Sequence, residues 1–275
     1  EFLKNKLWRN HEDIVRIHEY LGKLDTAIAV ASYRQSLVSY AIPEIEFSME
    51  TKPFIEAEDI THPLIDTAVG NSIYTKESLL ITGSNASGKS TYLKTVAIGA
   101  VMAQAICTCT ARYYKGSGFF IYSSMALADD VLSGDSYYVT EIKSLKRILD
   151  STKTEYPILC VVDEILRGTN TVERIAASSE ILKALAERDV ISIAATHDIE
   201  LCGLLKDIFT SYHFEEKFEG NVMIFDYKIK PGPARSRNAI KLLEILCFDD
   251  IIVENASTLA SIYDDKGVWM SLGSE

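Results

Sequence analysis

A short glycine-rich segment has the clearest chemical potential in this sequence. It consists of Gly83, Ser84, Asn85, Ala86, Ser87, Gly88, Lys89, Ser90 and Thr91, and it matches the P-loop (Walker A) pattern GxxxxGK[ST]. Glycines let backbone N–H groups turn toward phosphate oxygens, and the start of a following helix adds positive potential. The pattern assigns Lys89 to the β and γ phosphates of a nucleotide and the Ser90 hydroxyl to Mg²⁺. The alternative is an ordinary glycine turn, but an apolar run before the segment and a helical pattern after it favour the phosphate site.

Three further polar side chains follow apolar runs that have the form of buried strands. Asp163 and Glu164 end "PILCVVDE" (157–164), and His197 ends "VISIAATH" (190–197). An Asp in this Walker B position can hold Mg²⁺ through water, and a following Glu can orient or deprotonate the attacking water. A kinase would not need the second carboxylate, so the pair favours hydrolysis, and His197 can sense the γ-phosphate. The alternatives are a solvated loop carboxylate for Glu164 and a core or loop histidine for His197.

The elements that must position these residues alternate between strand and helix. Strands are expected at 78–82, 157–164 and 190–197, where the residues are continuously apolar. Helices are expected from Ser90 to about Ala105 and, on amphipathic spacing, over 171–188. This alternation predicts an α/β fold with a mostly parallel sheet flanked by helices, and with its chemistry at the C-terminal ends of the strands.

Both ends of the chain show helical patterns. A single apolar stripe over 11–40, ended by Pro43, predicts a long helix that is either part of the core or a strut to a further domain. Residues 44–78 are expected to form short strands and turns. "SRNAIKLLEIL" and "FDDIIVENASTLA" predict two helices around a short turn near the C-terminus. The chain begins without Met inside a helical pattern, so we expect it to be a fragment.

Length, charge and cysteine content limit the function classes. With 275 residues, 47% of them hydrophobic, the chain can form one sizeable α/β domain and an appendage. Lys and Arg total 28 against 39 Asp and Glu, and the net charge of −11 argues against a general nucleic-acid-binding surface. Five cysteines without a CxxC pair suit a reduced, cytoplasmic chain. The sequence has no signal peptide or membrane-length apolar run, although tethering of the full-length protein to a membrane stays open.

The segment after Glu164 reads "ILRGTNT", and with it the chain resembles the ATPase domain of the MutS DNA mismatch-repair family over about residues 20 to 260. "TGSNASGKST" is similar to that family's "TGPNMGGKST", "DEILRGTNT" to "DEIGRGTST", "AATHDIEL" to "ATHYFEL", and "GDSYYVTEI" to "GRSTFMVEM". The resemblance implies an ABC-ATPase-like P-loop fold that uses ATP and Mg²⁺. It also implies three parts: the end of a lever helix (1–43), the ATPase domain (44–230), and a dimerisation hairpin with a tail (231–275).

The resemblance further implies that two ATPase domains face each other in a homodimer. Ser136, at a helix start, would reach the partner's γ-phosphate, which fits the anion preference of helix N-termini; the local alternative is an N-cap. Asn71 would contact the base. Ala68 stands where the family has a stacking aromatic, which leaves Tyr74 as a candidate substitute, and Cys247 begins the segment that replaces the family's Gly-Leu-Pro turn. DNA would be bound by domains outside this chain, and little DNA binding is expected from the chain alone.

Three functions compete for this sequence. The first is a MutS-like ATPase module whose ATP-dependent dimerisation controls DNA binding elsewhere in the full protein. The second is an ABC-class ATPase subunit such as a transporter's, because "LSGDS" (132–136) resembles the LSGGQ pattern; "LRGTNT" argues against it. The third is a non-catalytic ATP-binding adaptor, which is disfavoured because the phosphate, metal and water-orienting residues are all present. A DNA-reading helix-turn-helix at the C-terminus is disfavoured because acidic residues offset its basic ones.

Overall fold

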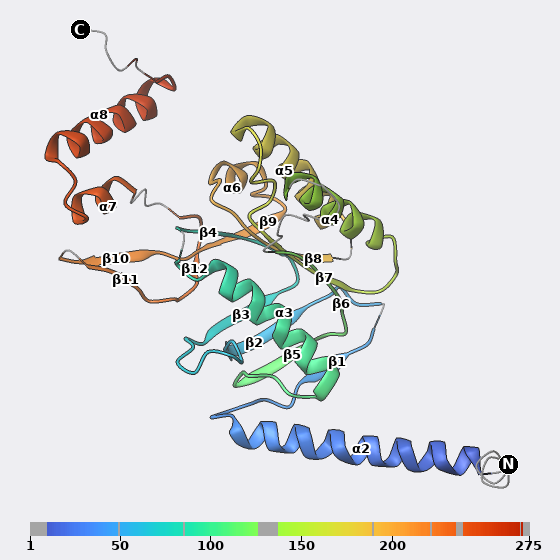
Figure 1. Cartoon of the computed structure of the whole chain (residues 1–275). Helices are drawn as coiled ribbons and strands as arrows, with labels where there is room; N and C mark the ends of the chain where they lie inside the picture. The colour runs from blue at the N-terminus through green and yellow to red at the C-terminus, as the bar shows by residue number, and fades with distance from the viewer. Residues whose placement is uncertain are drawn as a thin grey trace, which may run out of the picture.

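The computed structural model (Figure 1) describes residues 10–48, 50–84, 86–125, 137–188, 190–220, 222–234, 239–269 and 271. Two residues with expected nucleotide contacts, Asn85 and Ser136, lie outside the described residues. Their assignments therefore stay predictions. Along the described ranges, no helix combines the length and the apolar character needed to cross a membrane.

A six-stranded sheet forms the centre of the molecule (Figure 1). In spatial order its strands are β12 (Lys230–Pro231), β9 (Phe209–His213), β4 (Ser78–Thr82), β8 (Val190–Ala195), β7 (Ile158–Asp163) and β6 (Phe120–Ser124). The strands from β9 to β6 pair in parallel, and β12 pairs antiparallel to β9. The three strands predicted from apolar runs are β4, β7 and β8, which lie side by side in this sheet.

Helices cover both faces of this sheet, and the prediction of an α/β fold is confirmed. The helices of the sheet region are α3 (Lys89–Ile106), α4 (Tyr137–Ser151), α5 (Thr171–Ala186) and α6 (Glu200–Leu204). Helix α3 lies on one face, where it packs against β7 and β8, and α4, α5 and α6 lie on the other (Figure 1). The side chains of a single strand alternate between the faces. Leu79 and Ile81 join the core under α3, whereas Leu80 joins the core under the other helices.

A second, four-stranded sheet packs beyond α3. Its strands, in spatial order, are β1 (Glu44–Glu46), β5 (Tyr113–Ser117), β2 (Ile55–Ile60) and β3 (Asn71–Thr75). The pairing is parallel between β1 and β5 and antiparallel elsewhere. Ile55 and Ala57 of β2 belong to the same apolar core as Leu93 and Val96 of α3. Helix α3 is therefore enclosed between two sheets, which fixes its direction.

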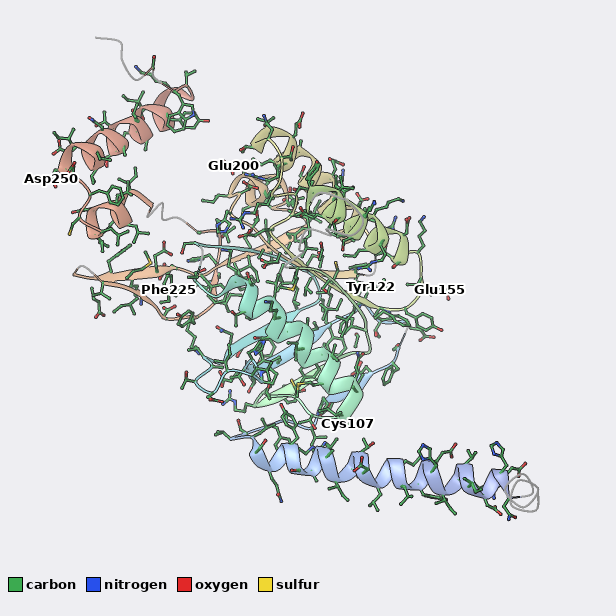
Figure 2. The ribbon with its side chains drawn as sticks, in the orientation of Figure 1. Cys107, Tyr122, Glu155, Glu200, Phe225 and Asp250 are labelled. Atoms are coloured by element: carbon green, nitrogen blue, oxygen red, sulfur yellow. The ribbon has the colours of Figure 1, made fainter. Side chains whose placement is uncertain are left out.

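The predicted N-terminal helix is α2 (His11–Ser36), and none of its residues is buried. Its apolar stripe is open to solvent, with Ile17, Leu21 and Leu24 each 58–59% exposed. The core-helix alternative is therefore wrong for this chain. The C-terminal end of α2 is anchored, because Arg34 donates hydrogen bonds to the Cys107 carbonyl (2.7 Å) and to Thr108 Oγ1 (2.8 Å). Figure 2 shows Cys107 at the end of α3 nearest α2.

Beyond the strands of the central sheet, the described part of the C-terminal region forms a β-ribbon and two helices. The ribbon is formed by β10 (Glu216–Glu219) and β11 (Val222–Phe225), and the helices are α7 (Ala239–Ile245) and α8 (Asp250–Lys266). The helices contact each other and stand apart from the sheets in Figure 1, as the two-helix prediction expected. Cys247, in the turn between them, has a left-handed φ of 57°. This conformation favours glycine, so the turn keeps a glycine-like backbone without a glycine.

Candidate active site

The glycine-rich loop joins β4 to α3 in a backbone path that two of its glycines make possible. Gly83 has a φ of +144°, and a Cβ added there would lie 2.6 Å from the carbonyl oxygen of Phe214. Gly88 is the N-cap of α3, with a left-handed φ of +111°. Both positions exclude ordinary side chains. The loop can thus turn tightly into the start of α3, which is the arrangement that presents backbone N–H groups to an anion.

The other loop side chains hold the turn together. Ser87 is buried and donates a hydrogen bond to the Ser84 carbonyl (2.8 Å), and the Ser84 hydroxyl donates to Glu216 Oε2 (2.8 Å). Ala86 has a left-handed φ of 65°. One turn into α3, the Thr91 carbonyl accepts a hydrogen bond from a threonine hydroxyl in the next turn (2.7 Å). The loop is therefore held both by a contact within itself and by Glu216 of β10.

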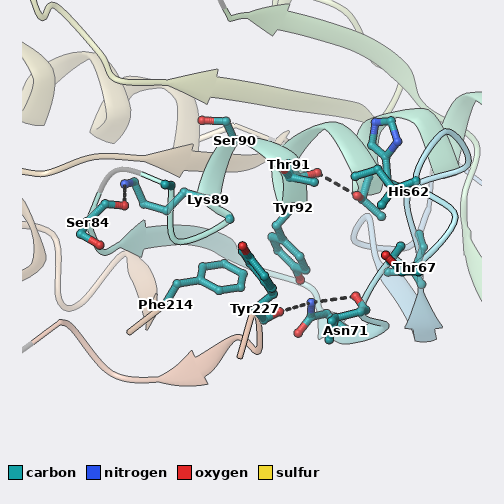
Figure 3. Close-up of a pocket in the computed structure, with 17 residues that line it drawn as sticks. His62, Thr67, Asn71, Ser84, Lys89, Ser90, Thr91, Tyr92, Phe214 and Tyr227 are labelled. Carbon is teal, nitrogen blue, oxygen red and sulfur yellow. Dashed lines mark hydrogen bonds between the residues drawn. The ribbon is translucent and has the colours of Figure 1, made fainter. Parts of the chain in front are cut away.

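Lys89 is the buried cation of the loop, only 4% exposed. Its Nζ donates hydrogen bonds to the carbonyls of Gly83 (2.7 Å) and Ser84 (2.8 Å), as Figure 3 shows for Ser84. Burial lowers the pKa of Lys89 to about 8, while the nearby carboxylates of Glu164 and Asp163 act in the opposite direction. An anion placed against this ammonium would favour its charged form. An anion that entered the loop would therefore be able to replace these two carbonyls as partners of the ammonium.

Two of the strand-end residues lie in one chain of contacts with Lys89. His197 Nε2 is 3.4 Å from Lys89 Nζ and 2.8 Å from Glu164 Oε1. The second oxygen of Glu164 forms an ion pair with Arg167. Strand β8 lies between β4 and β7, so the ends of these parallel strands bring the loop, Glu164 and His197 together. The assignments of Glu164 and His197 stay predictions, beside the alternatives of a solvated loop carboxylate and of a core or loop histidine.

The segment that carries His197 is anchored by the next residue. Asp198 accepts two hydrogen bonds from the guanidinium of Arg174 in α5, at 2.8 and 2.6 Å. Such two-point pairs fix both distance and orientation. Asp198 N–H also donates to Thr196 Oγ1 (3.0 Å). The imidazole therefore projects from a segment that is held on both sides.

Asp163 and Ser90 offer the oxygen atoms that a magnesium ion prefers. Asp163 ends β7, and its Oδ1 is buried without a hydrogen-bond partner among the described residues. A buried carboxylate oxygen without a partner is costly unless a ligand or water satisfies it. Ser90, in the first turn of α3, lines the cavity beside the loop. A carboxylate and a hydroxyl are hard oxygen donors, so these residues fit Mg²⁺.

A cavity of about 530 Å³ adjoins the loop, a size typical of small-molecule sites. Its lining includes the aromatic rings of Tyr92, Phe214 and Tyr227 (Figure 3). The rings of Tyr92 and Phe214 meet edge to face, with centroids 5.8 Å apart. Ala68 and Val69 contribute further apolar surface. The cavity can therefore accept a flat apolar group next to the glycine-rich loop.

Asn71 lines this cavity, but its amide is already engaged. Its Nδ2 donates to the Tyr227 carbonyl (2.9 Å), and its Oδ1 accepts from the Ile229 N–H (2.9 Å). A direct contact with a base stays a prediction. Tyr74, the candidate stacking residue, donates its hydroxyl to Glu58 (2.8 Å) and is not among the residues that line the cavity. Sequence reasoning missed Tyr227, because no local motif marks a residue so distant along the chain.

A comparison with protein families then decides where this chain belongs. The family described as MutS domain V matches residues 79–263, a span that holds the loop and all the strand ends just described. The chain belongs to the MutS family. Its resemblance to that family, expected from the motifs, is confirmed.

Individual MutS relatives match over much of this chain. The DNA mismatch repair protein MutS of Carboxydothermus hydrogenoformans is 29% identical over 93% of the chain, and that of Fervidobacterium nodosum is 31% identical over 93%. That of a Thermus thermophilus strain is 30% identical over 67% of the chain. These alignments cover 32%, 31% and 23% of the relatives' own lengths. The chain thus spans about a third or less of the MutS proteins that it matches.

Proposed function

We propose that this chain is the ATP-binding and ATP-hydrolysing domain of a MutS-like DNA mismatch-repair protein, with a P-loop NTPase fold of the ABC-ATPase type. The observation that carries the proposal is the contact chain from Lys89 through His197 to Glu164 beside the glycine-rich loop. This series of contacts joins a cation of the kind that binds phosphate to a carboxylate of the kind that activates water. Family membership supports the same assignment.

Binding of ATP would use the loop and the adjoining cavity together. The loop N–H groups, the start of α3 and Lys89 would take the phosphates. The nucleoside would occupy the cavity. There Tyr227 offers an aromatic face, which would replace that of the aromatic residue found in the family where this chain has Ala68. Ser90 and Asp163 would hold Mg²⁺, whose charge offsets that of the phosphate oxygens.

Hydrolysis would use Glu164 and His197. Glu164 would orient the attacking water and accept its proton while the water oxygen bonds to the γ-phosphorus and the bond to the β-γ bridging oxygen breaks. ADP and inorganic phosphate are the products. His197 touches both Lys89 and Glu164, so it would sense the γ-phosphate from a position between them.

The proposal extends to a homodimer and to DNA bound outside this chain. Residues 1–43 would form the end of a lever helix, 44–230 the ATPase domain, and 231–275 a dimerisation hairpin with a tail. Ser136 would complete the partner's site, and ATP-dependent dimerisation would control DNA binding. The exposed stripe of α2 supports the lever assignment. The net charge of −11 supports weak DNA binding by this chain alone.

Calorimetric titration with Mg-ATP tests the phosphate assignment. Lys89→Ala removes a charge-assisted contact typically worth ~1.5–3 kcal/mol, so we expect ATP affinity to fall by roughly 10- to 150-fold. Lys146→Ala is the matched control, because Lys146 is an exposed lysine of α4 that pairs with Asp150, and we expect wild-type affinity from it. Wild-type affinity in Lys89→Ala would show that the loop is not the phosphate site.

A further inference from the structure

The turn that follows β7 holds Glu164 in an uncommon backbone conformation. Glu164 and Leu166 both have left-handed φ angles, 54° and 55°, which residues with side chains adopt rarely. Such a turn persists only where its surroundings determine it. On one side, the Glu164 N–H donates to the Ala195 carbonyl of β8 (2.9 Å). A second constraint holds this turn on the side of α4.

A buried carboxylate from α4 supplies this second constraint. Glu141 is only 2% exposed, and its Oε1 accepts a hydrogen bond from the Leu166 backbone N–H. Its Oε2 is buried and has no hydrogen-bond partner in the described part of the chain. Burial raises the pKa of Glu141, the bond from Leu166 lowers it, and the charge of Glu164 raises it further. A buried carboxyl with one amide partner stabilises a core poorly, which points to a role other than packing.

Helix α4 contacts the same loop at further points. A Cβ added at Gly168 would lie 3.2 Å from Tyr138 Cβ, so the first turn of α4 packs directly against the loop backbone. Deeper in the structure, Leu145 of α4 shares a buried cluster with Ile165 and Leu166. The start of α4 and the loop after β7 are therefore packed against each other, and the Glu141 hydrogen bond is their polar link.

We propose that Glu141 is a positioning residue for Glu164. By holding the Leu166 amide, it fixes the turn that directs the Glu164 carboxylate toward His197. This inference rests on the proposed hydrolytic function, to which it adds a residue that would act through the position of Glu164. Glu141 also lies one turn into the helix that follows Ser136 in the sequence. It therefore links the segment assigned to the partner's nucleotide with the hydrolytic carboxylate of its own subunit.

Two substitutions at Glu141 separate the effect of side-chain length from the effect of the carboxylate charge. Glu141→Gln keeps the side-chain length and the accepting oxygen but removes the charge. Glu141→Asp keeps the charge but withdraws the oxygens from the Leu166 amide. Ser144→Ala is the packing control, because it removes a buried, unpartnered hydroxyl from the next turn of α4. Each variant is measured for ATP affinity, for kcat, and for hydrogen exchange of the Leu166 amide.

We expect Glu141→Asp to lower kcat by about a hundredfold, the loss that a ~1 Å misplacement of a catalytic group produces. ATP affinity should stay within about threefold of wild type, because the phosphate loop is untouched. Exchange of the Leu166 amide should become faster. Glu141→Gln and Ser144→Ala should both keep kcat within about threefold of wild type.

Three results would overturn the positioning role: an unchanged kcat in Glu141→Asp, an unchanged Leu166 exchange rate in that variant, or a Gln variant as impaired as the Asp variant. Hydrogen exchange needs no turnover, so it separates this proposal from the one on which it rests. A folded wild-type chain that neither binds nor hydrolyses ATP would overturn the proposed function, whatever the Leu166 amide does.

Discussion

Replacing Glu164 with glutamine should separate ATP binding from ATP hydrolysis. Glutamine keeps the shape and the oxygen that lies 2.8 Å from His197 Nε2, but it cannot accept the proton of the attacking water. Removal of a general base typically costs ~10²–10⁴ in rate, which corresponds to about 2.7–5.4 kcal/mol in the barrier. Phosphate release by Glu164→Gln should therefore fall at least about a hundredfold.

The structural side effects of this substitution should be much smaller. Glutamine breaks the ion pair with Arg167, whose side chain is 62% exposed, and such a pair is worth about 0.2–1 kcal/mol. Loss of the Glu164 charge also lowers the pKa of Lys89, which is about 8 before the substitution. Lysine is charged at pH values below its pKa. With a lower pKa, Lys89 therefore loses its positive charge at a lower pH than in the wild type. Binding is therefore compared at several pH values below 8, because the charged fraction of Lys89 increases as pH falls.

The assay follows phosphate release, ATP affinity by calorimetry, and oligomeric state by gel filtration in Mg-ATP. Because ATP is expected to bridge two subunits, Glu164→Gln should accumulate as a dimer with near-normal ATP affinity. Glu173→Gln makes the same chemical change at an exposed position in the first turn of α5 and should hydrolyse ATP like wild type. A Glu164→Gln protein that turns over ATP within a few-fold of wild type would refute the base assignment and leave His197 as the next candidate.

Two further predictions concern the base and the partner. Tyr227→Ala should weaken ATP binding by roughly 5- to 150-fold, the effect of losing ~1–3 kcal/mol of base stacking. Tyr74→Ala should leave the ATP affinity measured by calorimetry unchanged. Equal ATP affinities in the two variants would remove Tyr227 from the base site. Lys89→Ala and Ser136→Ala should each be inactive alone but should regain hydrolysis when mixed, because one heterodimer site is then intact. Failure to complement, with activity strictly linear in protein concentration, would favour a self-contained monomeric site.

The site could be predicted from sequence where its residues belong to local motifs at strand ends. Lys89 follows a glycine pattern, and Glu164 and His197 each end an apolar run, so parallel strands bring them to one edge. Tyr227 could not be predicted, because it reaches the cavity through a contact with Asn71 that spans 156 residues. Glu141 was missed for a similar reason. Its partner amide is 25 residues away. That amide belongs to a turn with left-handed φ angles, which its residue types do not predict because they are not glycines.

For the fold too, local features could be predicted from the sequence and long-range contacts could not. Hydrophobic periodicity predicted α2 and α5 with small errors at their ends, because it reports which face of a segment is apolar. It does not report what covers that face, and the stripe of α2 is uncovered in this chain. The second sheet was expected only as short strands and turns. Its parallel pairing of β1 with β5 joins Glu44 to Lys115, a long-range choice that local spacing does not encode.

Single-turnover hydrolysis of radiolabelled Mg-ATP, with the protein in excess, tests the central claim most directly. It needs neither rapid product release nor DNA, and it reports only whether this site cleaves the γ-phosphate. The account predicts phosphate release in a single phase from wild type, and release that is abolished by Lys89→Ala and strongly slowed by Glu164→Gln. A folded wild-type protein that releases no phosphate, or release that both variants leave unchanged, would contradict it.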